Sequence, residues 1–217
     1  MTEDWIPLLW QATRETLVMV GVAMAVTIPF GLALGVLLLI TSPGQILEAR
    51  WANRAIGAIV NVGRSVPFII LLIAVIPLTR ALVGTTIGTT AAIVPLALAT
   101  IPFFARIVET ALREVPGGLI EAALAAGARR REIVAKVLIP EALPSLVAGV
   151  TITTIGVIGY SAMAGAVGGG GLGDVAIRYG YQRYDTAITI ATVVILVVLV
   201  QLFQLAGDWF ARRLSHA

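Results

Sequence analysis

The chain has 217 residues, of which 59% are hydrophobic and 12% charged, with a net charge of +3 and a mean hydropathy of +0.98. A soluble domain carries about 25% charged residues, so this chain has too few charges to cover a water-facing surface, and lipid must replace water over much of it. The absence of cysteine excludes disulfides and thiolate chemistry, and the single histidine, His216, leaves a histidine-based metal site or proton relay almost nothing to use.

Five apolar stretches are each long enough to cross a bilayer, which takes about 20 residues. The first stretch carries no charge and ends at Thr41-Ser42-Pro43-Gly44. It is too long for a signal peptide and follows acidic residues, so we expect a retained helix. The second contains one charge, Arg64, and the fifth starts after Asp185, a plausible N-cap. The sequence therefore predicts an all-α polytopic membrane bundle, a single domain over 1–217, with spans at about 17–40, 56–79, 87–105, 143–167 and 186–207.

The lysines and arginines between the spans predict the orientation, because they gather on the cytoplasmic side. Ten lie on one side and four on the other, and Arg64 is expected to snorkel toward the first side. We therefore expect the N-terminus outside and the C-terminus in the cytoplasm. The ten are Arg50, Arg54, Arg106, Arg113, Arg129, Arg130, Arg131, Lys136, Arg212 and Arg213, and the four are Arg14, Arg80, Arg178 and Arg183.

Spans one, three, four and five contain no charged residue and no histidine. Such groups are costly in a membrane unless they are used, so their absence argues against proton-coupled transport and voltage sensing. No arginine or acid lies deep in these spans to bind a zwitterion, and selectivity is expected to reside on another protein. Five spans are too few for two inverted repeats, which predicts a second copy. Gly31 and Gly35 form a small-xxx-small pair that permits close helix approach.

The segment between spans three and four, Pro116 to Pro144, has the composition of two short cytoplasmic helices. Pro116 is placed to start the first helix and Gly127 to end it in a left-handed conformation. The second is expected from about Arg130 to Leu138 and is stopped by Pro140. The first helix has a small apolar face that suits a groove on another protein, formed by Leu119, Ala122, Ala123 and Ala126.

Two groups of motifs resemble a known family. Glu121-Ala122-Ala123, then Gly127, then Val137-Leu138-Ile139-Pro140 resembles the EAA loop of ABC importer permeases, with valine and isoleucine replacing the isoleucine and leucine of the pattern. Arg64 to Leu72 and Gly159 to Gly173 are similar to methionine-importer permeases, and this likeness covers nearly the whole chain.

The resemblance implies a type I permease fold in a bacterial cytoplasmic (inner) membrane. The chain would not be an enzyme and would hold no cofactor or metal, because ATP and Mg²⁺ would bind a separate ATPase. Its partners would be a second copy, two ATP-binding subunits, an extracytoplasmic substrate-binding protein and membrane lipid, with no nucleic acid. The cargo would be an amino acid, methionine by family likeness. The residues that would couple to the ATPase are Glu121, Ala122, Ala123, Gly127, Arg129 and Pro140.

Tyr160, Ser161 and Met163 are candidates for a gate. A flexible apolar side chain at Met163 would close a narrow pore by dewetting, or it would fill a packing gap, and the sequence does not decide between the two. Gly168-x-Gly170-x-x-Gly173 fits a dinucleotide fingerprint, but it follows a membrane span where a strand is required.

Three alternative functions make different demands on the chain. An importer of the same class would carry another small amino acid or an osmolyte. A channel or facilitator that works without ATP would leave the EAA segment without a purpose. A membrane enzyme would need clustered polar or metal-binding side chains in the spans, and the sequence has none there.

Overall fold

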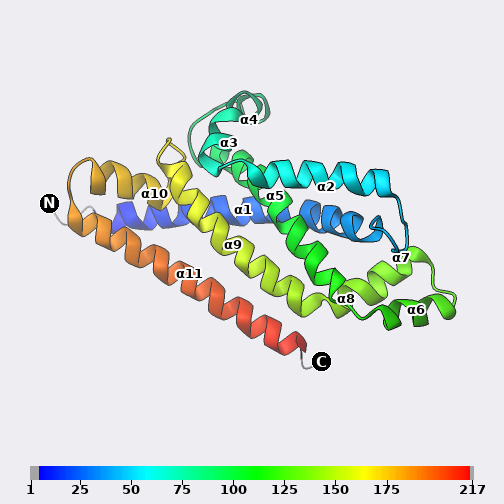
Figure 1. The fold of residues 1–217 in the computed structure, drawn as a ribbon. Helices are drawn as coiled ribbons and strands as arrows, with labels where there is room; N and C mark the ends of the chain where they lie inside the picture. The colour runs from blue at the N-terminus through cyan, green and yellow to red at the C-terminus, as the bar shows by residue number, and fades with distance from the viewer. Residues whose placement is uncertain (1–4, 216–217) are drawn as a thin grey trace.

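The computed structural model describes residues 5–215, so His216 lies outside the described part of the chain. Every regular element among these residues is a helix. Figure 1 shows an elongated bundle in which the long helices run between two ends. The N-terminus lies at one end, and the segment after α5 lies at the other.

Four helices are long and apolar enough to span a membrane: α1 (Trp5–Ile40), α5 (Thr89–Arg113), α9 (Leu143–Gly165) and α11 (Thr186–Ser215). Helix α1 ends where the sequence predicts but starts twelve residues earlier than residue 17. At 1.5 Å per residue its 36 residues extend over about 54 Å, well beyond a hydrocarbon core of about 30 Å. Helix α1 is therefore longer than a helix that crosses the hydrocarbon core along the membrane normal. Helix α11 starts as predicted, since the backbone N–H groups of Ala187 and Ile188 donate to Asp185 Oδ1 at 3.1 and 3.2 Å.

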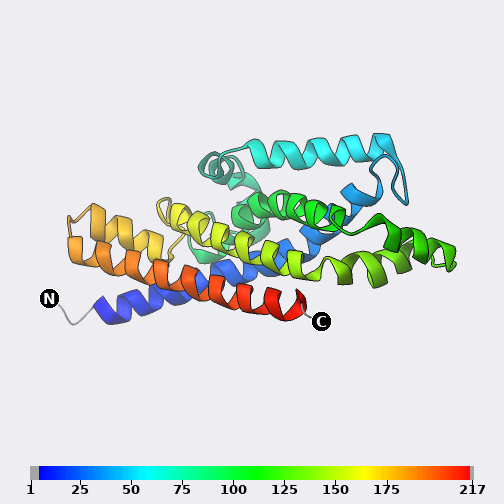
Figure 2. The same cartoon turned by 60° about the horizontal axis from the view of Figure 1, so that its bottom comes forward.

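The second predicted span is not one straight helix. It consists of α2 (Arg50–Ser65), α3 (Phe68–Ala74) and α4 (Ile76–Val83), and α2 and α3 meet at an angle of 103°. The break falls at Val66 and Pro67. Val66 is extended (φ −83°, ψ 122°) because a residue before proline is disfavoured in helical conformation, and Pro67 has no N–H to continue the ladder. Figure 2 shows α2 on the opposite side of the bundle from α11.

Close packing of α1 on α5 forms the centre of the bundle. A Cβ built on Gly31 would lie 2.7 Å from Phe104 Cδ1, and one built on Gly35 would lie 2.5 Å from Val108 Cβ. The predicted close approach of helices at these two glycines is therefore confirmed. Nearby, the buried hydroxyls of Thr27 and Thr100 share a hydrogen bond of 2.7 Å between the same helices.

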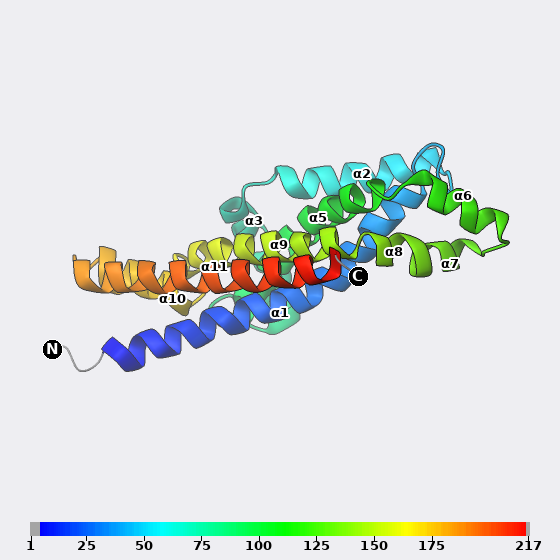
Figure 3. The ribbon, with the colours of Figure 1, turned by 90° about the horizontal axis from the view of Figure 1, so that it is seen from below.

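Short helices occupy the two ends of the bundle. At one end lie α6 (Gly117–Ala125), α7 (Arg130–Ile133), the π-helix η1 (Val134–Leu138) and α8 (Ile139–Glu141). At the other end α10 (Gly171–Val175) leads into a second π-helix, η2 (Ala176–Tyr181). Figure 3 shows α6 and α7 projecting past the long helices.

Candidate functional site: coupling segment and membrane pathway

Helix α6 carries the predicted coupling residues and buries none of its side chains fully. Glu121 and Ala122 are exposed, Ala123 is half-buried, and the large apolar side chains of Leu119 and Leu124 are 41% and 50% exposed. Within residues 5–215 Glu121 makes no hydrogen bond or ion pair. It therefore neither pairs with a side chain of its own helix nor links α6 to α7. Its carboxylate is available to a group on another protein.

Gly127 ends α6 as the sequence predicts. Its φ is +80°, the Gly127 N–H donates to the Leu124 carbonyl at 2.9 Å, and the Ala128 N–H donates to the Ala123 carbonyl at 3.0 Å. This pair of hydrogen bonds is a Schellman motif, which requires a left-handed residue at the glycine position. The geometry reverses the chain and sets the direction in which α6 points relative to α7.

Arg129 begins the next helix. Its backbone N–H donates to Glu132 Oε2 at 2.9 Å, which fixes the first turn of α7. This hydrogen bond, with a further contribution from Lys136, lowers the pKa of the Glu132 carboxyl from its ordinary value. The guanidinium of Arg129 is exposed, like those of Arg130 and Arg131, and adds positive charge to the projecting segment.

Pro140 does not stop the second coupling helix, and the prediction that it does was wrong. The chain passes from α7 through η1 and α8 into α9, with backbone hydrogen bonds from Ala142 to Leu138 and from Leu146 to Ala142. A proline ring would clash with the carbonyl four residues earlier in a regular α-helix. The π-helix directly before Pro140 widens that turn, and the Ile139 N–H donates to Val134 instead. Helical structure therefore continues from α7 into α9.

The base of the coupling segment is buried in the bundle. Ile133 and Leu138 are fully buried, and Leu138 lies in a cluster with Leu112 at the end of α5 and Leu146 at the start of α9. Ile120 of α6 packs against the same cluster. The projecting helix is therefore anchored to two spans, α5 and α9, by apolar contacts.

One buried carboxylate was not singled out from the sequence. Glu109 lies in the C-terminal part of α5, 6% exposed, and pairs with Arg106 one turn before it and with Arg113 one turn after it, the latter at 2.7 Å. Arg106 also donates to Asn61 Oδ1 of α2 at 2.9 Å. The spacing of the three charges was a visible signal, but the predicted span ended at residue 105 and assigned Arg106 and Arg113 to a loop.

The three gate candidates on α9 differ in environment. Tyr160 stacks on Phe68 of α3, with ring centroids 4.7 Å apart. Ser161 is 2% exposed and donates to the Ile158 carbonyl at 2.7 Å, so its hydroxyl serves the helix itself. Met163 is 49% exposed and therefore fills no packing gap within this chain. Of the three, the environment of Met163 best suits a gate.

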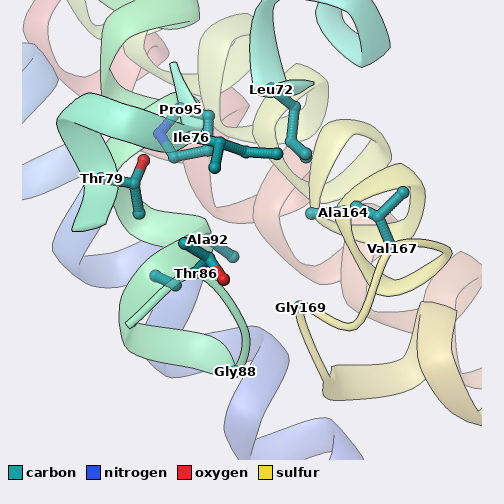
Figure 4. A pocket seen from close by; sticks show the side chains of 11 residues that line it. Leu72, Ile76, Thr79, Thr86, Gly88, Ala92, Pro95, Ala164, Val167 and Gly169 are labelled. Carbon is teal, nitrogen blue, oxygen red and sulfur yellow. The ribbon is translucent and has the colours of Figure 1, made fainter. Parts of the chain in front are cut away.

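The end of the bundle near the N-terminus contains a small cavity and, beside it, a groove of about 560 Å³ between α1, the start of α5 and α10. The cavity in Figure 4 lies between α3, α4, the start of α5 and the end of α9, and it holds about 20 Å³. The glycine loop, residues 168–171, lies beside this cavity, and the Gly88 N–H donates to the Gly168 carbonyl at 2.8 Å. Glu15 and Thr16 of α1 accept the N–H groups of Gly171 and Leu172 at 2.8 and 2.9 Å, an anchor for this loop that the sequence did not reveal.

A groove of about 440 Å³ lies between α2, α5 and α9, and its lining includes Arg64, Phe103, Ile107 and Ile152. No group of three or more histidine, cysteine, aspartate or glutamate side chains that could hold a metal occurs within residues 5–215.

Residues 28–216 match the family described as the inner membrane component of binding-protein-dependent transport systems. The chain belongs to this family. A relative from Vibrio cholerae serotype O1, named a probable D-methionine transport system permease protein, is 57% identical over 96% of this chain and 93% of its own. The methionine import system permease protein of Bacillus subtilis is 44% identical over 92% and 90%.

Solved structures agree with this assignment. The permease superposes on a chain of the MetNI methionine ABC transporter in an inward-facing conformation with a TM-score of 0.97 and 51% identity, covering 99% of both chains. A chain of an amino acid ABC transporter crystallised with histidines shares the fold, with a TM-score of 0.80 at 21% identity over 97% and 95%. The chain is thus a permease subunit of an ABC importer, with the all-helical fold predicted from its sequence.

Proposed function

We propose that this permease imports methionine, as a pair of identical copies that works with two ATP-binding subunits and an extracytoplasmic binding protein. The observation that carries the proposal is the coupling segment: α6 projects from one end of the bundle with Glu121, Ala122 and Leu119 uncovered, while its base is buried against α5 and α9. Such a face suits a groove on the ATP-binding subunit. The names of the relatives above support methionine as the cargo.

The proposed mechanism transmits force through α7 and η1. ATP binding draws the two ATP-binding subunits together and moves α6 with them. Because helical structure continues from α7 through Pro140 into α9, and Leu138 packs on Leu112, the displacement reaches α5 and α9 as bodies and alters access to the pathway. Glu121, Ala122, Ala123 and Arg129 form the contact, and Gly127 fixes its direction. Met163 on α9 serves as a gate in the closed state.

The charge distribution supports the proposed orientation in a bacterial cytoplasmic membrane. The coupling segment and the C-terminal arginines lie at the end assigned to the cytoplasm, and the N-terminus and α10 lie at the end assigned to the outside. ATP and Mg²⁺ bind the partner subunit in this scheme, and this chain holds no cofactor.

Purification and transport together test the proposal. The wild-type permease is expected to co-purify with its ATP-binding subunit, and a Glu121→Arg/Gly127→Val double variant to lose it. Reconstituted with the binding protein in liposomes, the wild-type complex should take up labelled methionine only when ATP is supplied. Uptake without ATP would support a channel, and uptake of a different amino acid or an osmolyte in place of methionine would correct the cargo.

A further inference from the structure

Arg64 lies near the end of α2 that is far from the coupling segment, with its side chain exposed on the flank of the bundle. Helix α2 starts at Arg50 near the coupling segment, and fourteen residues at 1.5 Å each place Arg64 about 21 Å farther along its axis. Its neighbour Gly63 packs against Pro102, in the middle of α5. The hydrocarbon core is about 30 Å thick, so this distance along α2 corresponds to most of the length of a membrane span.

The guanidinium of Arg64 has no hydrogen bond or ion pair within residues 5–215. Arg106, the other arginine of the groove, already donates to Glu109 and Asn61. A charged side chain inside a membrane protein is rare and faces a partner or a water-filled path. Arg64 therefore offers unused hydrogen-bond donors to whatever enters the groove.

The groove beside Arg64 has the chemistry of an amphipathic site. Its volume of about 440 Å³ falls in the range of ligand pockets, roughly 300–1,000 Å³. Phe103, Ile107 and Ile152 give it apolar walls. Thr110 and Ser145 add hydroxyls that make no side-chain hydrogen bond within the described chain.

The groove also shares a helix face with the proposed gate. Ile152 and Met163 are eleven residues apart on α9, close to three full turns, and both are about half exposed. The apolar groove and Met163 therefore open on the same side of the bundle. The groove is thus the next opening along this face of α9 on the coupling-segment side of Met163.

We propose that this groove is a transient binding site for the transported amino acid, with the α-carboxylate on Arg64 and the apolar side chain along Ile107 and Ile152. The proposal rests on the proposed function and names a specificity-determining residue for it. A guanidinium binds a carboxylate through two parallel N–H donors, which a neutral cargo or an alcohol does not match. Glu114, eight residues after Arg106 and thus about 12 Å farther along α5, marks the inner mouth of the groove.

Photo-crosslinking of the assembled complex tests the site directly. The permease with its ATP-binding subunits is placed in nanodiscs of phosphatidylcholine and irradiated with photo-methionine, a diazirine analogue that keeps the carboxylate and the amine. Label is then mapped to peptides by mass spectrometry. We expect it on peptides containing Ile107 or Ile152, removed by excess methionine but not by methioninol, which lacks the carboxylate.

Variants of two arginines on α2 supply the matched comparison. Arg64→Gln is expected to lower the labelling at least about tenfold, because a hydrogen-bonded charge is lost, and Arg64→Lys to restore part of it. Arg54→Gln is the control, since Arg54 is exposed on the same helix and does not line the groove. Equal labelling in wild type and Arg64→Gln, or equal competition by methioninol, would overturn the proposal.

A change of lipid and a transport measurement complete the experiment. If labelling disappears when phosphatidylglycerol replaces phosphatidylcholine, an anionic lipid headgroup holds Arg64 and the proposal is wrong. ATP-dependent uptake by the same wild-type complex is measured in parallel. Uptake of methionine without label in the groove overturns this inference alone, whereas absence of uptake overturns the proposed function and the inference with it.

Discussion

Replacement of Gly127 is the sharpest test of the coupling segment. Its φ of +80° is unfavourable for a residue with a Cβ, by about 1–2 kcal/mol, and a Cβ built there meets no atom within 4 Å. The whole cost is therefore one of backbone conformation and not of packing. It lowers the population of the observed turn by a factor of about 5–30. We expect Gly127→Val to leave the spans folded while α6 loses its fixed direction, so that ATP is hydrolysed with little uptake.

The assay is the number of methionine molecules imported per ATP hydrolysed in proteoliposomes. Gly127→Asn should lie between Gly127→Val and wild type, because asparagine tolerates the left-handed conformation. Gly118→Ala is the matched control: Gly118 lies in the same segment, has ordinary helical conformation and has open space around it, so alanine should be neutral or stabilising. A wild-type ratio in Gly127→Val, or an equal loss in Gly118→Ala, would refute the coupling role of this turn.

Three other substitutions have defined outcomes. Glu109→Gln removes the buried charge between two arginines and should lower the free energy of unfolding by roughly 2–3 kcal/mol. The change is measured as a lower melting temperature of the purified permease. Glu48→Gln, in an exposed ion pair, should leave the melting temperature unchanged. Gly35→Ala should lower the free energy of unfolding by about 1–3 kcal/mol, because the added methyl group overpacks the contact between α1 and α5. Gly21→Ala is the control, since a Cβ at Gly21 has no atom within 4 Å. Equal melting temperatures of the two variants would contradict close packing at Gly35. Met163→Ala should raise basal ATP hydrolysis or leak if this side chain closes the pathway, and an unchanged background would count against a gate.

The local features of the bundle follow from the sequence. Hydropathy alone locates four of the five spans. A capping side chain at Asp185 and the missing Cβ at Gly127 likewise decide the conformation of residues close together in the chain. The contact at Gly31 and Gly35 was predictable for the same reason, since their spacing places both on one helix face. The coupling segment was found from its motif and composition, and only its end at Pro140 was misjudged, because a π-helix accommodates a proline that a regular α-helix would not.

Tertiary structure alone decided which charges have partners. Glu109 is buried because α5 continues past the predicted end of the span, and Glu15 fixes the glycine loop because α1 extends far enough to meet residues 156 positions later in the chain. Arg64 is a single charge in an apolar stretch of the sequence, and the break at Pro67 and the packing of Gly63 on Pro102 place it beside an open groove. The cost of a charge depends on the groups and the solvent around it, and those are set by helix packing and not by neighbours in sequence.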